Sequence, residues 1–341
     1  MTAPNRLRLD GGALVENWRA LARMSGAATC GAAVKADGYG LGARDIVRRL
    51  AAAGCRDFFV ATWAEAAALA DTGVKLSVLH GVRHDDLALA SQHIARPVLN
   101  TPTQVRRWRE AGFGVCDVMV DTGMNRLGIS PDAITAGLLD GLEIDTLMSH
   151  LACADEASSV NERQRATLAA LSGRTNARRL SLANSAGVAL GADYAFDLTR
   201  PGLALYGGVP CAALAGVIRP VMTIEAEILQ RRLVPAGEQV GYNLTWTAAR
   251  DSDVAIVNLG YADGYKRAFS NAGIAFVGAQ RVPVIGRVSM DLTALDVTGL
   301  DAGEGDWIAF DADLPRASAA SGVSQYELLT GLGDRFERRW I

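Results

Sequence analysis

One lysine in this chain stands where an apolar run meets a glycine-rich stretch. The segment Gly31–Gly42, G-A-A-V-K-A-D-G-Y-G-L-G, predicts a short buried strand that ends at Lys35 and a turn that brings backbone close to a ligand. Burial there destabilises the ammonium ion and lowers its pKa, so the neutral amine can act as a nucleophile that forms a Schiff base. The alternative is a lysine that only extends its charge into solvent. Tyr39, in the turn, is a possible phosphate ligand.

A second group of residues could hold an anion. Asn184 and Ser185 stand at an expected strand-to-helix junction, where amide, hydroxyl and helix N-terminal N–H groups can bind a phosphate together. A serine that only caps the helix is the alternative, and the two roles are compatible. Gly202, in T-R-P-G-L-A-L-Y, permits close approach of backbone to phosphate. Arg200 beside it stays protonated, so it would keep a facing pyridine nitrogen unprotonated.

Two further polar residues follow expected strands. Arg126, in D-T-G-M-N-R-L-G, can clamp a carboxylate through two parallel hydrogen bonds, or it can pair with Asp121 across the turn. His150, one of four histidines, can orient a neighbour or relay a proton, or it can simply bond a nearby carbonyl. The other histidines have no matching partners and the five cysteines lack metal-ligand spacing, so no metal site is expected.

The last third of the chain offers a possible base. Tyr261 lies in the glycine-bounded turn L-G-Y-A-D-G-Y-K, and Met290 lies at the end of an expected strand. Tyrosines in turns usually serve packing. A tyrosine held near positive charge can instead lose its proton and act as a general base.

The elements that must position these residues alternate in type. From Arg6 to Tyr206, short apolar strands alternate with helices about eight times, and Leu203–Tyr206 is expected to be the closing strand. This alternation is typical of an α/β fold with a closed (β/α)8 barrel of the TIM type, although an open doubly wound sheet produces a similar pattern. No G-x-G-x-x-G opens a helix after the first strand, which disfavours a dinucleotide-binding sheet.

Beyond Val221 the chain changes character. Strand-like segments are separated by turns, with a short helix expected at 324–330 and a charged tail at 335–340. We therefore expect two domains, a barrel over residues 1–220 and a mostly β domain over residues 221–341.

Composition limits the class of partner. The chain has 341 residues, of which 50% are hydrophobic, and a net charge of -3, so it offers no electrostatic reason to bind nucleic acid or an anionic membrane. A small-molecule ligand is expected instead. The odd number of scattered cysteines fits reduced thiols, and neither a signal peptide nor a membrane-spanning run is seen. We expect a cytoplasmic protein.

Six ordered segments carry a resemblance to a known family. They read V-K-A-D-G-Y-G-L-G, D-T-G-M-N-R-L-G, A-N-S-A, R-P-G-L-A-L-Y-G, G-Y-A-D-G-Y and G-R-V-S-M-D. Together they resemble the alanine racemases that depend on pyridoxal 5'-phosphate. The resemblance implies an N-terminal (β/α)8 barrel, a C-terminal β domain and a homodimer whose active sites are shared between subunits. It also implies interconversion of L- and D-alanine, with D-alanine supplied for peptidoglycan.

The resemblance also implies a role for each matching residue. Lys35 would bind the cofactor as a Schiff base and act as base on the D-alanine face, and Tyr261, from the partner subunit, would be the base on the L-alanine face. The other implied contacts are the phosphate ligands Tyr39, Ser185, Gly202 and Tyr326, the pocket residue Asn184, Arg200 at the pyridine nitrogen, His150 between Arg200 and Tyr261, and Arg126 with the Met290 backbone at the substrate carboxylate.

Three positions depart from the family pattern. Many members have a carbamylated lysine where this chain has Met119, so Arg126 must find another partner. Some members have a histidine at the position of Ser181, which thins the expected hydrogen bonding under Arg200. A cysteine is common at the position of Ser289, and little consequence is expected.

Other functions share parts of this pattern. A racemase for serine or another larger amino acid would use the same residues, because they do not define the side-chain pocket. A non-catalytic carrier of pyridoxal phosphate needs only the barrel, so the β domain with Tyr261 argues against it. A decarboxylase of this architecture would be expected to have an acidic residue in place of Arg200.

Overall fold

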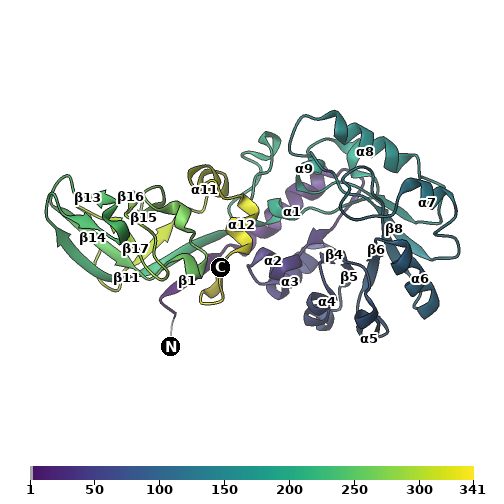
Figure 1. The fold of residues 1–341 in the computed structure, drawn as a ribbon, viewed down its shortest axis with the longest axis horizontal. Coiled ribbons are helices and arrows are strands. Elements are labelled where there is room, and N and C mark those ends of the chain that lie inside the picture. The colour runs from purple at the N-terminus through teal and green to yellow at the C-terminus, as the bar shows by residue number, and fades with distance from the viewer. Residues whose placement is uncertain (1–2) are drawn as a thin grey trace. The chain divides into compact units, whose positions relative to one another are not determined.

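Parallel strands alternate with helices from residue 29 to residue 199 in the computed structural model, which describes residues 3–341. The described chain divides into two units (Figure 1). The barrel unit contains Leu14–Leu205 and Val209–Arg219, and the β unit contains residues 3–13, Tyr206–Gly208 and Pro220–Ile341. None of the described helices has the length and apolar character needed to cross a membrane.

The barrel unit is built on nine parallel strands that form a nearly closed ring. The strands run in the order β2-β10-β9-β8-β7-β6-β5-β4-β3. Their bounds are β2 Thr29–Cys30, β3 Ala32–Ala33, β4 Asp57–Val60, β5 Lys75–Val78, β6 Arg96–Leu99, β7 Cys116–Met119, β8 Ile144–Met148, β9 Arg179–Ser181 and β10 Leu198–Thr199. With β2 and β3 counted as one interrupted strand, the ring has the eight strands of a (β/α)8 barrel, which confirms the expected fold.

The interruption at Gly31 closes the ring. The Gly31 N–H donates to the Thr199 carbonyl at 2.9 Å, while β3 on its other side pairs with β4. A β-carbon built on Gly31 would stand 2.8 Å from the Asp57 carbonyl oxygen, so only glycine fits where first, second and last strands meet.

Helices surround the strands in Figure 1. Polar caps define several of their ends: the Thr101 side chain accepts the Gln104 N–H, Pro102 begins the helix, and Gly112 ends it with a φ of +65°. The helices of residues 11–195 are α1 Gly11–Met24, α2 Lys35–Tyr39, α3 Ala43–Ala53, α4 Trp63–Leu69, α5 Leu87–Ala90, α6 Pro102–Ala111, α7 Pro131–Thr135, α8 Ser159–Ala169, α9 Ser185–Val188 and α10 Ala192–Ala195.

Charged side chains near the amino ends of the strands form a network. Arg179 donates to Asp57 at 2.9 Å and to Asp145 at 2.6 Å, and Arg96 pairs with Asp145 at 2.7 Å. The fully buried Asp117 accepts from the Ser77 hydroxyl at 2.6 Å. These partners compensate for the burial of the charges. The network leaves the opposite, carboxyl ends of the strands for ligands.

The expected closing strand at Leu203–Tyr206 is wrong. These residues form a 3-10 helix, η3, and the closing strand is β10, four residues earlier. The physical reason is that the Ser185 hydroxyl accepts the N–H groups of Gly202 and Ala204 at 3.0 and 3.1 Å, which turns this backbone away from the ladder.

The β unit is mainly an eight-stranded sheet in the order β14-β17-β16-β15-β18-β11-β1-β19. Strand β1 (Asn5–Leu9), with which the barrel's alternation of strands and helices was expected to begin, instead pairs here, antiparallel to β11 and parallel to β19. The segment expected to be a charged tail contains strand β19. The remaining bounds are β11 Met222–Val234, β12 Gln239–Val240, β13 Trp246–Thr247, β14 Ser252–Val257, β15 Ile274–Val277, β16 Gln280–Ile285, β17 Thr293–Asp296, β18 Trp307–Phe310, β19 Glu337–Trp340, α11 Leu314–Ser321 and α12 Gln325–Thr330.

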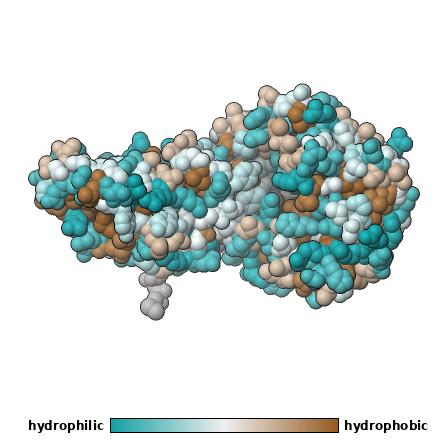
Figure 2. Space-filling view, in the orientation of Figure 1, coloured by the Kyte–Doolittle hydropathy of each residue, from teal (hydrophilic) through white to brown (hydrophobic). Residues whose placement is uncertain are grey.

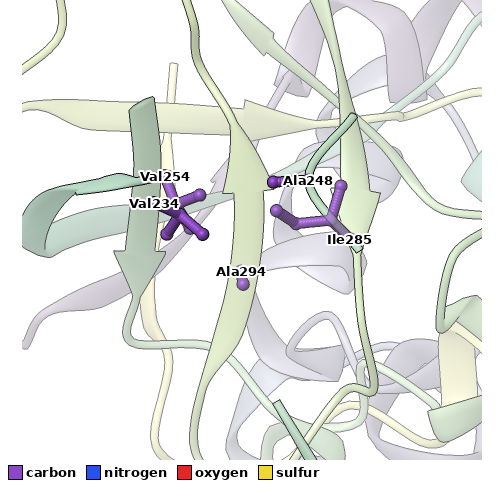
Figure 3. Packing of buried hydrophobic residues seen from close by; sticks show 5 residues of the cluster. All are labelled: Val234, Ala248, Val254, Ile285 and Ala294. Carbon is purple, nitrogen blue, oxygen red and sulfur yellow. The ribbon is translucent and has the colours of Figure 1, made fainter. Parts of the chain in front are cut away.

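A small apolar cluster packs inside one end of the β unit. Figure 3 shows its members, Val234, Ala248, Val254, Ile285 and Ala294, which come from strands distant in sequence and from the segment after β13. Much apolar surface nevertheless stays exposed in this unit, and brown residues interrupt its hydrophilic surface in Figure 2. Among the described residues, nine of the eleven exposed large hydrophobic side chains belong to the β unit.

Candidate functional site

Lys35 begins a turn with rare backbone geometry. The four residues after it, Ala36, Asp37, Gly38 and Tyr39, all have φ between +50° and +63°. Such left-handed conformations cost about 1–2 kcal/mol for each residue with a side chain, and strained backbone of this kind concentrates at functional sites. The half-buried Lys35 has its pKa lowered by burial and then by the charge of Arg126, while Glu65 opposes that shift. A smaller fraction of its amine is therefore protonated at neutral pH.

Tyr39, Gly202 and Ser185 form a cradle. A β-carbon built on Gly202 would lie 2.2 Å from the Tyr39 hydroxyl, so this hydroxyl occupies the space beside the glycine backbone. The buried Ser185 hydroxyl accepts the N–H groups of Gly202 and Ala204 on the other side. Asn184 caps helix α9 by accepting the Gly187 N–H at 2.9 Å. The cradle brings the hydroxyl groups of Tyr39 and Ser185 beside the Gly202 backbone, and hydroxyl groups are among the donors that bind phosphate.

Arg200 is a buried cation for which residues 3–341 supply no hydrogen-bonded carboxylate. Its guanidinium donates to the Ser181 hydroxyl and to the Ser149 backbone carbonyl, and it lies 6.0 Å from the centre of the Phe59 ring. Burial lowers its pKa to about 10, and the charge of Asp117 opposes the shift. Arg200 thus remains charged at neutral pH. Ser181, at the position where thinner hydrogen bonding was expected, supplies a hydrogen-bond acceptor to Arg200.

His150 is surrounded by cations. Burial, and after it the charges of Arg200, Arg126 and Lys35, lower the pKa of His150 to about 3. Its backbone carbonyl accepts the Gln164 side-chain amide at 3.0 Å, which anchors the residue after β8. The imidazole is therefore neutral at physiological pH and can accept a hydrogen bond.

Arg126 is exposed and makes no side-chain hydrogen bond or ion pair within residues 3–341. The alternative pairing with Asp121 does not form, because the Asp121 carboxylate accepts the N–H groups of Gly123 and Asn125 at 2.9 and 3.0 Å. Met119 is buried at the end of β7. The guanidinium is thus available to an anion.

These barrel residues gather at one end of the ring. Each lies in the segment that follows the carboxyl end of a strand: Lys35 after β3, Arg126 after β7, His150 after β8, Ser185 after β9 and Arg200 after β10. The carboxyl ends of parallel barrel strands share one face, and binding residues in such barrels lie there.

In the β unit, the segments that contain Tyr261 and Met290 are hydrogen-bonded to each other. The N–H groups of Tyr261 and Ala262 donate to the carbonyls of Ser289 and Met290, both at 3.0 Å. The two side chains are 42% and 54% exposed. Tyr326, on α12, is also exposed, and the helix begins with a capping box between Ser324 and Glu327. All three are therefore accessible on the surface of this unit.

Sequence reasoning missed Tyr242, a tyrosine that is 69% exposed. It lies between β12 and β13 and is followed by Asn243 and Leu244, both with positive φ. It lines a groove of about 530 Å³ together with Arg287, Ser289 and other residues of the β unit. The signal available was a tyrosine after Gly241 in a short turn, the same kind of signal that drew attention to Tyr261.

Comparisons with known proteins agree with this geometry. Residues 9–210 match the family described as "Alanine racemase, N-terminal domain", and residues 221–340 match "Alanine racemase, C-terminal domain". The chain belongs to the alanine racemase family. The resemblance found in the six sequence segments is thereby confirmed.

Relatives in the alanine racemase family match over their full length. The chain is 43% identical to "Alanine racemase" of Acidiphilium cryptum, covering 97% of each chain. It is 40% identical to "Alanine racemase, catabolic" and 41% identical to "Alanine racemase, biosynthetic" of Agrobacterium fabrum, over 99% of this chain and 92% and 94% of theirs.

Solved structures of the family share the fold. The alanine racemase of Bartonella henselae, described with covalently bound pyridoxal phosphate, superposes with a TM-score of 0.91 at 34% identity, covering 99% of this chain and all of that one. The biosynthetic alanine racemase of Pseudomonas aeruginosa gives a TM-score of 0.90 at 33% identity over the full length of both chains.

Proposed function

We propose that this protein is an alanine racemase that uses pyridoxal 5'-phosphate to interconvert L- and D-alanine. The observation that carries the proposal is that Lys35, the cradle of Tyr39, Ser185 and Gly202, and the buried Arg200 all follow strands at the same end of the barrel. This cofactor requires an amine that binds it covalently, hydrogen-bond donors for its phosphate and a group that faces its pyridine nitrogen.

The residues fit the cofactor in charge and in space. Gly202 and the Tyr39 hydroxyl leave no room for a side chain between them, as expected where backbone must approach a phosphate. Within the described residues, the guanidinium of Arg200 bonds neutral oxygens, so it keeps its positive charge. A charged guanidinium N–H can donate a hydrogen bond to a pyridine nitrogen. The cofactor, when bound, supplies the electron sink that makes the α-proton of an amino acid removable.

Lys35 would hold the cofactor through its amine and carry the proton on the D-alanine face. The lowered pKa of Lys35 favours this work, because a general base needs a substantial neutral fraction near neutral pH. Arg126, with no partner of its own, would clamp the substrate carboxylate with the Met290 backbone. Neutral His150 would connect Arg200 to the base on the opposite face.

The opposite base would be a tyrosine of the β unit that acts on L-alanine. Tyr261 is our assignment, from its place in the G-Y-A-D-G-Y segment and from the hydrogen bonds that join this segment to Ser289 and Met290. Tyr242 competes for the role, because it is more exposed and lines a groove with the cations Arg232 and Arg287. Two bases on opposite faces produce racemisation, whereas one base produces stereospecific chemistry.

A homodimer with shared active sites follows from the same proposal. The β unit exposes several large apolar side chains, as interaction surfaces commonly do. They are Leu233, Tyr242, Leu244, Met290 and Leu292. A second copy of the chain would cover them and bring its tyrosine to the partner's Lys35.

The cellular role includes two alternatives. D-alanine for peptidoglycan is the role we propose, in the cytoplasm, where the five free cysteines would stay reduced. The names of the Agrobacterium fabrum relatives include one catabolic and one biosynthetic enzyme at nearly equal identity, so identity does not separate the roles. Serine or another larger amino acid remains the alternative substrate.

Borohydride labelling tests the attachment of the cofactor. The chain has only three lysines, Lys35, Lys75 and Lys266, so peptide mapping has three possible results. Reduction of the cofactor-loaded protein should fix the label on the peptide that contains Lys35. Label on Lys75 or Lys266 would overturn the proposal. So would labelling of Lys35→Arg to the same extent as the wild type.

A further inference from the structure

Glu65 connects two loops of the barrel at the position of Lys35. Its carboxylate accepts the Ala36 N–H at 2.9 Å through Oε1 and the Ala61 N–H at 2.6 Å through Oε2. Ala36 follows Lys35 directly, and Ala61 follows strand β4. One side chain therefore ties the loop after the first strand to the loop after the second.

The hydrogen bonds of Glu65 differ from those of a glutamate in an ordinary capping box. Thr62 caps helix α4 by accepting the Glu65 N–H at 3.3 Å, which is one half of a capping box. In a capping box the glutamate returns to the N–H of the capping residue itself. Here it bonds the preceding residue and a different loop, so its carboxylate does more than complete the helix.

The bond to Ala36 restrains strained backbone. Ala36 is the first of the four residues with positive φ, and the turn between Lys35 and Gly40 contains three residues other than glycine in this conformation. Such a turn persists only where its surroundings hold it. Glu65 supplies a charge-assisted hydrogen bond at its first residue, and charge-assisted bonds are stronger than neutral ones.

The charge of the Glu65 carboxylate also acts on the Lys35 amine, and it raises the pKa of that amine. The charged or titratable groups around Lys35 are Arg126 and His150 from the loops after β7 and β8, and Glu65 from α4. Arg126 is a cation and His150 is neutral at physiological pH. Glu65 is thus the nearby anion that opposes loss of the Lys35 proton.

We infer that Glu65 is a positioning residue for Lys35, which fixes the direction of the lysine through the Ala36 amide and balances the charge of its amine. The link to catalysis rests on the proposed function, since it assumes that Lys35 binds the cofactor. The two effects are separable, because the hydrogen bond to Ala36 needs the length of the Glu65 side chain, whereas the effect on the Lys35 amine needs only its charge.

The test uses the full-length protein without cofactor, so that it does not depend on activity. With lysine labelled by ¹³C at Cε, three side-chain signals are expected, and Lys35→Arg assigns the one of interest. Glu65→Gln should lower the pKa of Lys35 by roughly 0.5 to 1 unit, because an anion is removed from a partly buried amine. Glu65→Asp keeps the charge and should leave the Lys35 titration near that of the wild type.

Hydrogen exchange tests the restraint. In Glu65→Asp the shorter side chain cannot reach both loops, so exchange of the Ala36 amide should accelerate about tenfold, which corresponds to the loss of one hydrogen bond. Glu110→Gln, which removes an exposed carboxylate from α6, should change neither measurement. Unchanged Lys35 titration in Glu65→Gln, or unchanged Ala36 exchange in Glu65→Asp, would overturn the inference. If both expected changes are seen but borohydride places no label on Lys35, the inference about Glu65 stands and the proposed function is refuted.

Discussion

The hydroxyl of Tyr39 lies against the α-carbon of Gly202, so close that a β-carbon on the glycine would stand 2.2 Å from it. Tyr39 lies in α2, after β3, and Gly202 follows β10, so closure of the ring brings the two residues together. Their contact forms one wall of the cradle to which we assign the cofactor phosphate.

Gly202→Ala should therefore disrupt the cradle. The methyl group must displace the Tyr39 ring, since a β-carbon would also lie 2.9 Å from the ring carbon that carries the hydroxyl. We expect a loss of about 1–3 kcal/mol in the free energy of unfolding and at least a tenfold weaker affinity for pyridoxal phosphate, measured by denaturant unfolding and by cofactor titration. Gly303→Ala is the control, because its nearest contact, 3.9 Å, is ordinary. Wild-type cofactor affinity in Gly202→Ala would contradict the assignment.

Ser181→Ala should expose the dependence of Arg200 on its neutral partners. Removal of the hydroxyl leaves one guanidinium N–H without an acceptor in a buried site, which costs about 1–3 kcal/mol. We expect lower stability and a shifted absorption maximum of the bound cofactor, because Arg200 moves relative to the ring. Ser172→Ala, at an exposed position, should change neither. An unchanged absorption spectrum in Ser181→Ala would place Arg200 away from the cofactor.

Sequence predicted the barrel well because its signals are local. The strand bounds depend on short apolar runs, and the caps at Thr101 and Gly112 are readable without tertiary structure. Leu203–Tyr206 has the same apolar character as a strand, yet two hydrogen bonds to Ser185, seventeen and nineteen residues earlier, turn its backbone into a 3-10 helix. No local pattern contains that information.

The residues of the candidate site likewise divide into those that sequence could predict and those that it could not. Lys35, Arg200 and His150 were predictable because strand ends mark ligand-binding positions in a barrel. Glu65 was not, because its pattern with Thr62 suggests an ordinary helix cap, and the bond to Ala36 joins different strands. Tyr242 was passed over because exposure cannot be read from sequence.

His150 should remain neutral well below its usual pKa. Its pKa of about 3 lies below the unfolded value of about 6.5, so the unfolded chain binds more protons between these values and stability falls as the pH decreases through that window. His150→Gln removes this contribution, and the stability of the variant should decline less steeply between pH 6.5 and 4, by up to about 1.4 kcal/mol per pH unit. Urea unfolding across the pH range measures both slopes. Equal slopes, or an NMR titration of the His150 ring near pH 6.5, would contradict the prediction.

Substitution of Tyr261 and substitution of Tyr242 should differ in their effect on the conversion of L-alanine to D-alanine. If Tyr261 is the base on the L-alanine face, Tyr261→Phe should reduce removal of the α-proton from L-alanine about 100-fold to 10,000-fold, while cofactor affinity and proton exchange of D-alanine persist. Tyr242→Phe is the matched control, with the same hydroxyl removed from the same unit. Loss of L-alanine reactivity in Tyr242→Phe with activity retained in Tyr261→Phe would transfer the role to Tyr242. Equal loss of cofactor and activity would make the substituted tyrosine structural.

The most direct test of the whole account is exchange of the α-proton of L-alanine in deuterated water by the purified, cofactor-loaded protein, with the chirality of the product followed in parallel. We predict that deuterium enters the α-position as D-alanine forms. Exchange with retained L-configuration would contradict the two-base arrangement while leaving Lys35 in its role. Absence of exchange with alanine, alongside exchange with serine, would refute alanine as the substrate.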